Sequence, residues 1–483
     1  MKQLLFLLTP LILFSKLITG SVTDKDNVAI PFATITVATT SCSSISNING
    51  LFKLDCTDVL KNGVLTGAKN GYLIGSIKLK SDISSYELKL AKVPNSDNAH
   101  YKWIPSIDEK NEKACQNCHK KLTTQWKNSA HGSSAENQTF KDIYNKIYKS
   151  DFNSSYGNCA NCHQPINETK NISCDFCHKI YRVNPKKNLT GTLAIELRRP
   201  QYGGKNILFG SVKDAYTRDD SYSPLYKSSK YCASCHSGHF WDEEVYNEYS
   251  QWQNSSYSKQ GISCQKCHMP PQMSETFIAP PERGGLKRSA GAYHSHKFRG
   301  SKDIEFMKKA LDINVSVNSK NDINVNDINV SVSLENIGAG HSFPTGSPLH
   351  HLILVVDVKD YNSKKLVQLS GEKLPNWSVT KQSAGSVFAK VYRSSPAYTT
   401  ESSHFKPLYP NPYWRPSQLE FDTRLKANSP ILKQYIFKNT KKSVNIEVKL
   451  IYRRIYYNWA KNLGKKLDDD IILFHKIFKL ENR

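Results

Sequence analysis

Apolar and polar residues alternate along both ends of this chain, and the alternation is lost in between. In ITGSVTDKDNVAIPFATITVATT, which starts at Ile18, apolar side chains recur at every second position between turn signals, which is the period of a β-strand. LDINVSVNSKNDINVNDINVSVSLEN, which starts at Leu311, alternates in the same way and repeats Asp-Ile-Asn-Val three times. LILVVDVKDY and NIEVKLIYRRIYYNW are further strand candidates. The pattern predicts a β-rich region at each end.

A length of 483 residues is too great for one ordinary core. We predict a β-sandwich over residues 16–93, in which the Asn-Gly pairs of NINGLFKL and AKNGYLIGSIKLK form turns at strand entries. A second all-β, sandwich-like domain is predicted over residues 311–483. Residues 94–310 have few long amphipathic repeats and many loops, so a mostly helical and irregular domain is predicted there.

The first residues have the composition of a secretory signal peptide. A lysine is followed by an apolar run from Leu4 to Phe14, which is too short for a spanning helix. We predict removal of residues 1–15, with cleavage as late as Gly20 as the alternative, because the next strand is expected to begin at Leu17. No later stretch is long enough to cross a bilayer. The mature protein is expected to be exported, in the periplasm or at the cell surface or outside the cell, and not membrane-spanning.

Ten of the twelve cysteines fall in five copies of one motif, Cys-x-x-Cys-His. Zinc ribbons and disulfides also use paired cysteines, but neither needs a histidine directly after the second one. Histidine makes up 15 of the 483 residues. The odds of five such histidines by chance are below roughly one in 10⁷, and the motif is that of covalent c-type haem attachment.

We therefore predict five covalently bound haem c groups in residues 94–310, whose macrocycles supply the apolar core that the side chains there lack. The short link between His163 and Cys174 predicts that the second and third haems touch. The thioether residues are Cys115, Cys118, Cys159, Cys162, Cys174, Cys177, Cys232, Cys235, Cys264 and Cys267. The proximal iron ligands are His119, His163, His178, His236 and His268.

The supply of second axial ligands favours histidine over methionine. Beyond Met1 there are only Met269, Met273 and Met307, whereas ten histidines lie outside the motifs. Bis-histidine ligation gives lower potentials than histidine–methionine ligation. His239 is too close to its own motif to reach over that haem, so it would serve a neighbour. The candidate distal ligands are His131, His239, His294, His296 and His341.

The block from Trp126 to His131, the five motifs, EYSQWQNSSYSKQGISCQKCHMP and HKFRGSKD resemble the exported multihaem cytochromes c related to the nitrifier tetrahaem cytochrome and to hydroxylamine oxidoreductase. The resemblance covers residues 94–310 and implies a pentahaem domain with His131 as a distal ligand. Members of this group relay electrons, or reduce and oxidise small nitrogen and sulfur compounds. The catalytic ones often carry a lysine in place of the motif histidine, and this sequence has no such variant.

Residues 16–93 resemble the carboxypeptidase regulatory-like β-sandwich, on the segments Gly20–Asp24, Asn49–Phe52 and Gly71-Tyr72. The resemblance implies a stabilising or docking module without peptidase activity. Cys42 and Cys56 flank a predicted hairpin, so they form a disulfide or are a pair of buried free thiols.

The turn Gly340–Gly346 and the segment Asp422–Arg424 are similar to segments of other exported multihaem cytochromes. This likeness would place His341 on a loop that faces the haem domain.

The formal net charge of +24, reduced by up to about ten haem propionates, leaves a basic protein. A basic protein favours acidic or membrane-associated redox partners; the alternative is that the lysine excess reflects a genome rich in AT. Nucleic acid is not an expected partner of an exported haem protein. The favoured function is an electron carrier with no catalytic residue. The alternatives are an oxidoreductase with one open haem that acts on a small nitrogen or sulfur compound, and a subunit of a surface conduit.

Overall fold

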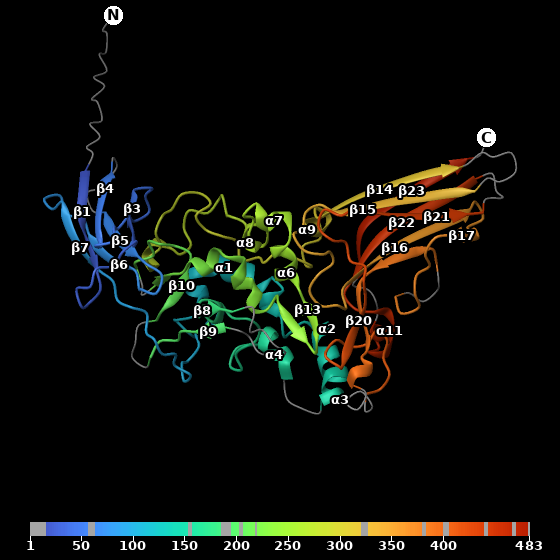
Figure 1. Ribbon diagram of the computed structural model, residues 1–483, viewed down its shortest axis with the longest axis horizontal. Helices are drawn as coiled ribbons and strands as arrows, with labels where there is room; N and C mark the ends of the chain where they lie inside the picture. The colour runs from blue at the N-terminus through green and yellow to red at the C-terminus, as the bar shows by residue number, and fades with distance from the viewer. Residues whose placement is uncertain are drawn as a thin grey trace, which may run out of the picture.

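A computed structural model describes residues 16–56, 63–152, 157–184, 195–201, 206–217, 220–319, 327–378, 383–398, 405–438, 443–465 and 470–481. Two β structures lie at opposite ends of the molecule, and a region of short helices and loops lies between them (Figure 1). The predicted signal peptide, residues 1–15, lies outside the described residues. The first strand, β1, begins at Lys16, one residue before the expected position.

The N-terminal β structure consists of two sheets with the strand orders β4-β1-β7 and β3-β2-β5-β6. Apolar residues alternate with exposed ones, as in β4, and those of both sheets meet in one core in which Ile18, Ile35, Leu65 and Leu88 are at most 1% exposed. Cys42 and Cys56 are joined by a disulfide, with their Cα atoms 5.7 Å apart. The strands are β1 (Lys16–Thr23), β2 (Thr34–Val37), β3 (Ser43–Ile45), β4 (Leu51–Cys56), β5 (Val64–Ala68), β6 (Gly75–Lys78) and β7 (Ser85–Lys89).

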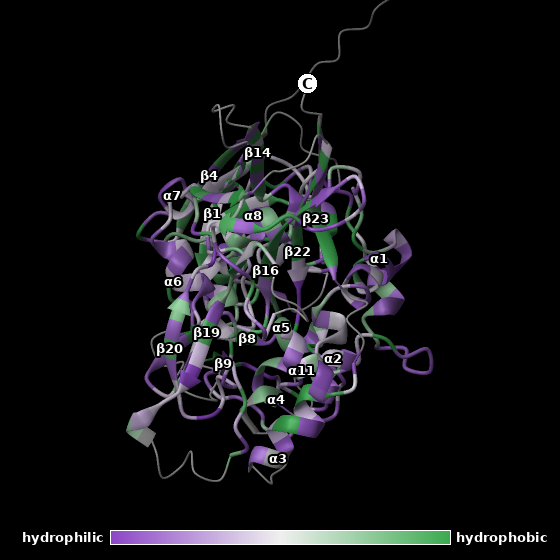
Figure 2. Cartoon of the chain, turned by 90° about the vertical axis from the view of Figure 1, so that its right-hand side faces the viewer, coloured by the Kyte–Doolittle hydropathy of each residue, from purple (hydrophilic) through white to green (hydrophobic). Residues whose placement is uncertain are grey.

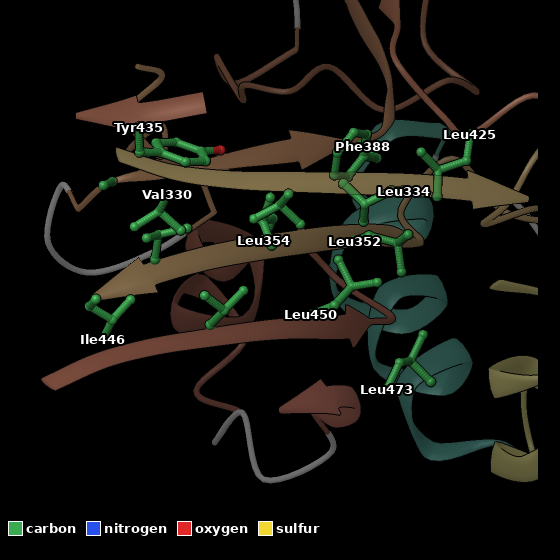
Figure 3. Close-up of a cluster of buried hydrophobic side chains, with 14 of the residues drawn as sticks. Val330, Leu334, Leu352, Leu354, Phe388, Leu425, Tyr435, Ile446, Leu450 and Leu473 are labelled. Atoms are coloured by element: carbon green, nitrogen blue, oxygen red, sulfur yellow. The ribbon is translucent and has the colours of Figure 1, made fainter. Parts of the chain in front are cut away.

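The C-terminal β structure likewise consists of two sheets, each with four strands, in the orders β14-β15-β21-β17 and β18-β16-β22-β23. Every second residue of β15 is buried, and these residues meet those of β16 and β22 in a large apolar core (Figure 3). The strands are β14 (Leu311–Ser319), β15 (Ile328–Asn336), β16 (His351–Asp360), β17 (Gln368–Ser370), β18 (Gly385–Phe388), β21 (Ile431–Phe437), β22 (Ser443–Arg453) and β23 (Ile471–Glu481).

Beneath these sheets lies a part of the C-terminal region that is not all-β (Figure 2). It contains the ribbon β19 (Lys390–Ser394) and β20 (Ser417–Asp422), the 3-10 turn η7 (Pro396–Tyr398) and the helix α11 (Tyr457–Asn462). The alternation of the flanking strands did not predict this helix. Its Trp459 is fully buried in an aromatic cluster that also takes in Tyr144 and Tyr148 of the middle region.

The middle region is built from short helices and two-stranded ribbons, which agrees with the prediction of helix and loop. Two of its apolar clusters are small, one around Phe176 and Ile180 and one around Ile207 and Phe209. The helices are α1 (Gln116–Lys127), α2 (Gln138–Ile143), α3 (Lys149–Phe152), α4 (Gly157–His163), α5 (Cys174–Cys177), α6 (Glu248–Gln253), α7 (Ser256–Lys259), α8 (Cys264–His268) and α9 (Ile304–Lys308). The 3-10 and π turns are η1 (His131–Ser133), η2 (Tyr144–Tyr148), η4 (Pro224–Lys227), η5 (Ser229–Ser234) and η6 (Pro281–Arg283). The ribbons pair β8 (Ile180–Val183) with β9 (Ile195–Leu197), β10 (Leu208–Gly210) with β11 (Asp220–Tyr222), and β12 (Gly238–Phe240) with β13 (Glu243–Tyr246).

Direct hydrogen bonds join both β structures to the middle region. At the N-terminal side the backbone N–H of Ile74 donates to the carbonyl of Asp220 at 2.9 Å, and that of Thr39 donates to the Asp214 carboxylate at 2.7 Å. At the C-terminal side the buried Arg415 guanidinium donates to the carboxylate of Asp151. Within the described ranges, no helix has both the length and the apolar character needed to span a bilayer.

Candidate functional site: the motif histidines and their partners

Each Cys-x-x-Cys-His motif folds as about one turn of helix. In three motifs the histidine N–H donates to the carbonyl of the first cysteine, at 2.9 Å in His119, 3.0 Å in His178 and 3.0 Å in His236. The other two motifs lie within α4 and α8. Residues four apart share one helix face, so each turn presents its first cysteine and its histidine on the same side. This is the arrangement that a porphyrin bound through thioethers and through iron requires.

Four of the five motif histidines have their Nδ1 atom fixed by a backbone carbonyl. The acceptors are Ile278 for His119 at 3.0 Å, Ser134 for His163 at 2.8 Å, Phe209 for His178 at 2.7 Å, and Arg299 for His268 at 2.5 Å. A carbonyl only accepts, so Nδ1 carries the proton and the lone pair is on Nε2. The backbone thus orients each ring as a metal ligand whose Nε2 atom is free to bind iron.

Three motif histidines face a second imidazole across a gap. The ring centroids are 6.3 Å apart in His131–His236, 6.5 Å in His178–His296 and 6.2 Å in His268–His341. If a metal ion lies about 2.0 Å from each Nε2, two rings on opposite sides of it have centroids about 6.3 Å apart. These residues therefore fit one iron between each pair, and the three partners are among the distal ligands predicted from the sequence.

Burial keeps these imidazoles neutral, which is the form that binds iron. Desolvation lowers the pKa of His131 to about 3 and the pKa values of His268 and His296 to about 4. The same cause lowers the pKa values of His178 and His341 below the usual range for histidine.

His131 is positioned by the end of α1 and the turn that follows it. The indole N–H of Trp126 donates to the Ile172 carbonyl at 2.8 Å, and the Ile172 N–H donates to the His131 carbonyl at 3.4 Å. The Ser134 hydroxyl donates to the His163 carbonyl at 2.7 Å. One short loop thus supplies the imidazole opposite His236 and also holds the second motif.

His341 comes from the C-terminal region, on the loop between β15 and β16. Gln251 and Glu248 of α6 accept hydrogen bonds from the N–H groups of Ser342 and Gly346, at 2.9 and 2.7 Å. At Gly340 an added Cβ would lie 3.2–3.3 Å from Tyr257, Ser255 and Trp252, so the residue there permits close contact with α6 and α7. The predicted position of His341 on a loop that faces the middle region is what the structure has.

His296 lies on the segment that follows the fifth motif. Its backbone N–H donates a hydrogen bond to Gln125 Oε1 at 2.8 Å, and its ring lies 5.7 Å from that of Phe298. Phe298, with φ of 44°, also lies 4.4 Å from the ring of His131. This phenylalanine separates two of the distal candidates, and no sequence signal pointed to it.

The two remaining distal candidates are placed differently. His239 is exposed on β12, and among the described residues no motif histidine ring lies beside it. His294 is held by a 2.7 Å hydrogen bond between its Nδ1 and the Met269 carbonyl, and the ring contacts of the described residues do not pair it with a motif histidine. Two more histidines that were not candidates lie here: the half-buried His350 directly before β16, and the fully buried His351 at its first position.

The thiols show which motifs are neighbours in space. Cys115 of the first motif contacts Cys174 of the third, and Cys162 of the second contacts Cys235 of the fourth. Cys232 of the fourth motif contacts Cys264 of the fifth and lies near Cys177 of the third. The neighbours therefore run from motif 1 to motif 3 to motif 4, with motifs 2 and 5 both beside motif 4.

The second motif has different surroundings. The ring of Phe140 stacks on His163 at 4.0 Å, and among the described residues no second imidazole faces His163 at the spacing of the three pairs. The hydroxyl groups of Tyr246 and Tyr413 form a 2.7 Å hydrogen bond close to Cys159 and Cys162. Burial raises the pKa of both phenols, so both stay protonated.

Helical Cys-x-x-Cys-His turns whose histidines face second imidazoles across the width of one iron define a multihaem c-type cytochrome with covalently bound haem c. Residues 114–179 match the family model described as cytochrome c554 and c-prime. The fold is similar to that of a penta-heme cytochrome c552 from Thermochromatium tepidum, with a TM-score of 0.53 and 16% identity over 76% of this chain and 97% of the other.

Two other comparisons add nothing to this assignment. A cohesin–X-dockerin complex from Acetivibrio cellulolyticus is matched at 20% identity over 15% of this chain and 51% of that one, with a TM-score of 0.13 that carries no argument. No curated protein matches the chain.

Proposed function

We propose that the protein is an exported cytochrome that passes single electrons along five covalently bound haem c groups. The observation that carries this proposal is the set of three imidazole pairs at 6.2–6.5 Å. When bound, the haem groups supply one-electron chemistry at iron. Two histidine ligands on an iron leave no position for a substrate and favour a low potential.

The chain contributes rigid ligation and closely placed attachment sites. Backbone carbonyls fix the Nδ1 atoms, so the imidazoles need little rearrangement when an electron arrives. The thiol contacts support an order of attachment sites from motif 1 through motif 3 to motif 4, with branches to motifs 2 and 5. His341 would bind the iron of motif 5, so the C-terminal region would complete the site.

The ligand assignment is tested by alanine variants and a spin-state census of the oxidised protein by EPR. His131→Ala, His296→Ala and His341→Ala are each expected to convert one low-spin haem to high-spin. His239→Ala is the matched control, because its exposed ring lies beside no motif histidine among the described residues. Mass spectrometry of the exported protein is expected to show five haems. An unchanged EPR spectrum in all three variants would exclude the three pairs as axial ligands.

Motif 2 favours a second candidate function, an oxidoreductase acting on a small nitrogen or sulfur compound at an open iron. The ring that contacts His163 is that of Phe140, and among the described residues no second imidazole faces His163. The hydrogen-bonded pair Tyr246–Tyr413 lies near the cysteines of this motif. Binding of CO or cyanide to one haem in five of the unmodified protein would support this function. If neither ligand binds, the oxidoreductase is excluded and the electron carrier remains as the proposed function.

We also propose that the partners are redox proteins with acidic or membrane-associated surfaces, because the chain has a net charge of +24 before propionates are counted. Attraction between opposite charges raises association rates and is screened by salt. The rate of reduction by an acidic donor is expected to fall steeply between about 0.01 and 0.15 M ionic strength. A rate that is independent of salt would contradict this proposal.

A further inference from the structure

A fully buried ion pair joins the third motif to the residue that directly follows it. The Lys179 ammonium donates to Asp175 Oδ1 at 2.7 Å and to Asn206 Oδ1 at 3.0 Å. The side chains of Lys179 and Asp175 are 0% and 1% exposed. Asp175 lies between the two cysteines of the motif, and Lys179 directly follows the ligand His178.

The same carboxylate holds a second segment of the chain. Asp175 Oδ2 accepts a hydrogen bond from the Tyr101 hydroxyl at 3.0 Å and another from the Ile104 N–H at 2.9 Å. The Tyr101 ring lies 5.3 Å from the Lys179 ammonium. Both oxygens of Asp175 are therefore used, one for the ion pair and one for the segment before the first motif.

That segment links the first motif to the third. The Cys174 N–H donates to the Ser106 hydroxyl at 3.0 Å, and the Cys115 N–H donates to the Pro105 carbonyl at 3.1 Å. The Gln116 N–H donates to the Ser106 carbonyl at 3.1 Å. Residues 101–106 thus bridge the two motifs at the point where the thiols of Cys115 and Cys174 meet.

Stability alone does not account for this arrangement. The cost of removing two charges from water offsets most of their attraction, so a buried ion pair adds little to stability compared with apolar residues of the same size. A charge in such a place does act strongly on nearby groups, because the surroundings have a low dielectric constant.

We propose that Asp175 and Lys179 are positioning residues that hold motif 1 against motif 3 and set the reduction potentials of the haems attached there by keeping their two charges balanced. This inference rests on the proposed haem attachment. Reduction adds one electron to an iron and forms or breaks no bond. A nearby positive charge favours the reduced state and a nearby negative charge disfavours it.

The test uses the full-length holoprotein and a spectroelectrochemical titration with dithionite as reductant. Asp175→Asn leaves Lys179 unbalanced, so the midpoints of the two affected haems are expected to rise. Lys179→Met leaves the carboxylate unbalanced, so they are expected to fall. Each substitution is expected to change the equilibrium constant for one-electron reduction of the haem at least tenfold, which corresponds to a midpoint shift of about 59 mV. The double variant carries neither charge and is expected to return close to the unmodified midpoints.

Asp470→Asn is the matched control, since it breaks the ion pair with Arg453 in the C-terminal region, away from the motifs. If the Asp175→Asn single variant fails to fold, the double variant is compared with Lys179→Met instead. The midpoints of the double variant are expected to lie above those of Lys179→Met. Single variants that shift the same way, or not at all, while haem content by mass is unchanged, would overturn this inference and leave the proposed function standing. Absence of haem from the unmodified protein would instead overturn the proposed function.

Discussion

The two ends of the molecule and its middle exclude water by different means. In the C-terminal sheets, Val330, Val332 and Leu334 of β15 are fully buried against the opposite sheet, so the side chains form the core themselves. In the middle region the apolar clusters around Phe176 and Phe209 are small, and the motif cysteines are only half-buried. From this comparison we expect that an alternating sequence specifies its fold by itself, whereas the motif-rich sequence needs its covalent cofactors to fold.

The largest expected effect follows from withholding haem. If the full chain is produced without haem attachment, we expect the middle region to lose its fold while both β structures keep theirs, because each β structure has a large apolar core of its own, whereas the clusters around Phe176 and Phe209 are small. Limited proteolysis of the haem-free chain, with the fragments identified by mass, is the measurement. The holoprotein is the control. Equal resistance of the middle region in both forms would contradict the comparison.

The next effect concerns the buried ion pair between the middle region and the C-terminal region. Arg415 and Asp151 have side chains 6% and 4% exposed, and their N–H···O distances are 2.8 Å. Arg415→Met leaves a buried carboxylate without its ion pair, and we expect a loss of about 3–5 kcal/mol in the free energy of unfolding. Urea denaturation followed by circular dichroism measures this.

The control for that variant is Lys359→Met, which breaks the more exposed ion pair with Asp357. Exposed pairs contribute about 0–1 kcal/mol, so this variant is expected to differ little from the unmodified protein. Equal effects of the two substitutions would show that the buried ion pair of Arg415 with Asp151 contributes no more to stability than an exposed one.

The disulfide of the N-terminal sandwich gives a smaller and more local effect. Cys42 and Cys56 are 14 residues apart, and opening a loop of that size costs about 3 kcal/mol. We expect Cys42→Ser with Cys56→Ser to destabilise residues 16–93 by that amount, as measured by hydrogen exchange. The haem absorption spectrum is expected not to change. A spectral change would mean that this sandwich supports the haem sites.

The same comparison explains what the sequence predicted. The period of two in segments such as ITGSVTDKD and INVSVSLEN was sufficient for both β structures, since alternate residues of a strand face opposite sides. The Cys-x-x-Cys-His spacing was sufficient for the attachment turns, because that chemistry is local. Three of the candidate distal ligands, His131, His296 and His341, lie opposite motif histidines, and their role as iron ligands stays a prediction.

What the sequence did not predict depends on contacts between distant segments. The thiol contacts join Cys162 to Cys235 and Cys174 to Cys115, and no local pattern predicted them; the contact between the second and third haems stays a prediction. Nothing local assigns His131 to the fourth motif, because the pairing arises from the loop that Trp126 and Ile172 hold. Helix α11 was missed because tertiary packing of Trp459, and not periodicity, determines it.

The smallest expected effect tests whether the C-terminal β structure keeps a buried imidazole neutral. His351 is fully buried at the start of β16, its Nδ1 lies 2.9 Å from the Leu349 carbonyl, and its Nε2 has no partner among the described residues. Burial lowers its pKa to about 3. The folded state therefore stays neutral, while the unfolded state takes up a proton below pH 6.5, so stability is lost as the pH falls from 6.5 towards 3.

Between pH 7.5 and 5.5 this uptake amounts to a loss of about 1.4 kcal/mol from His351 alone. His351→Phe keeps the ring contacts with Trp377 and Tyr456 but has no proton to take up. The unmodified protein is therefore expected to lose about 1.4 kcal/mol more unfolding free energy between pH 7.5 and 5.5 than His351→Phe does. This expectation holds whichever of the two proteins is the more stable at pH 7.5. Denaturant titrations of both proteins at the two pH values measure it. A constant difference would mean that burial does not hold the His351 ring neutral.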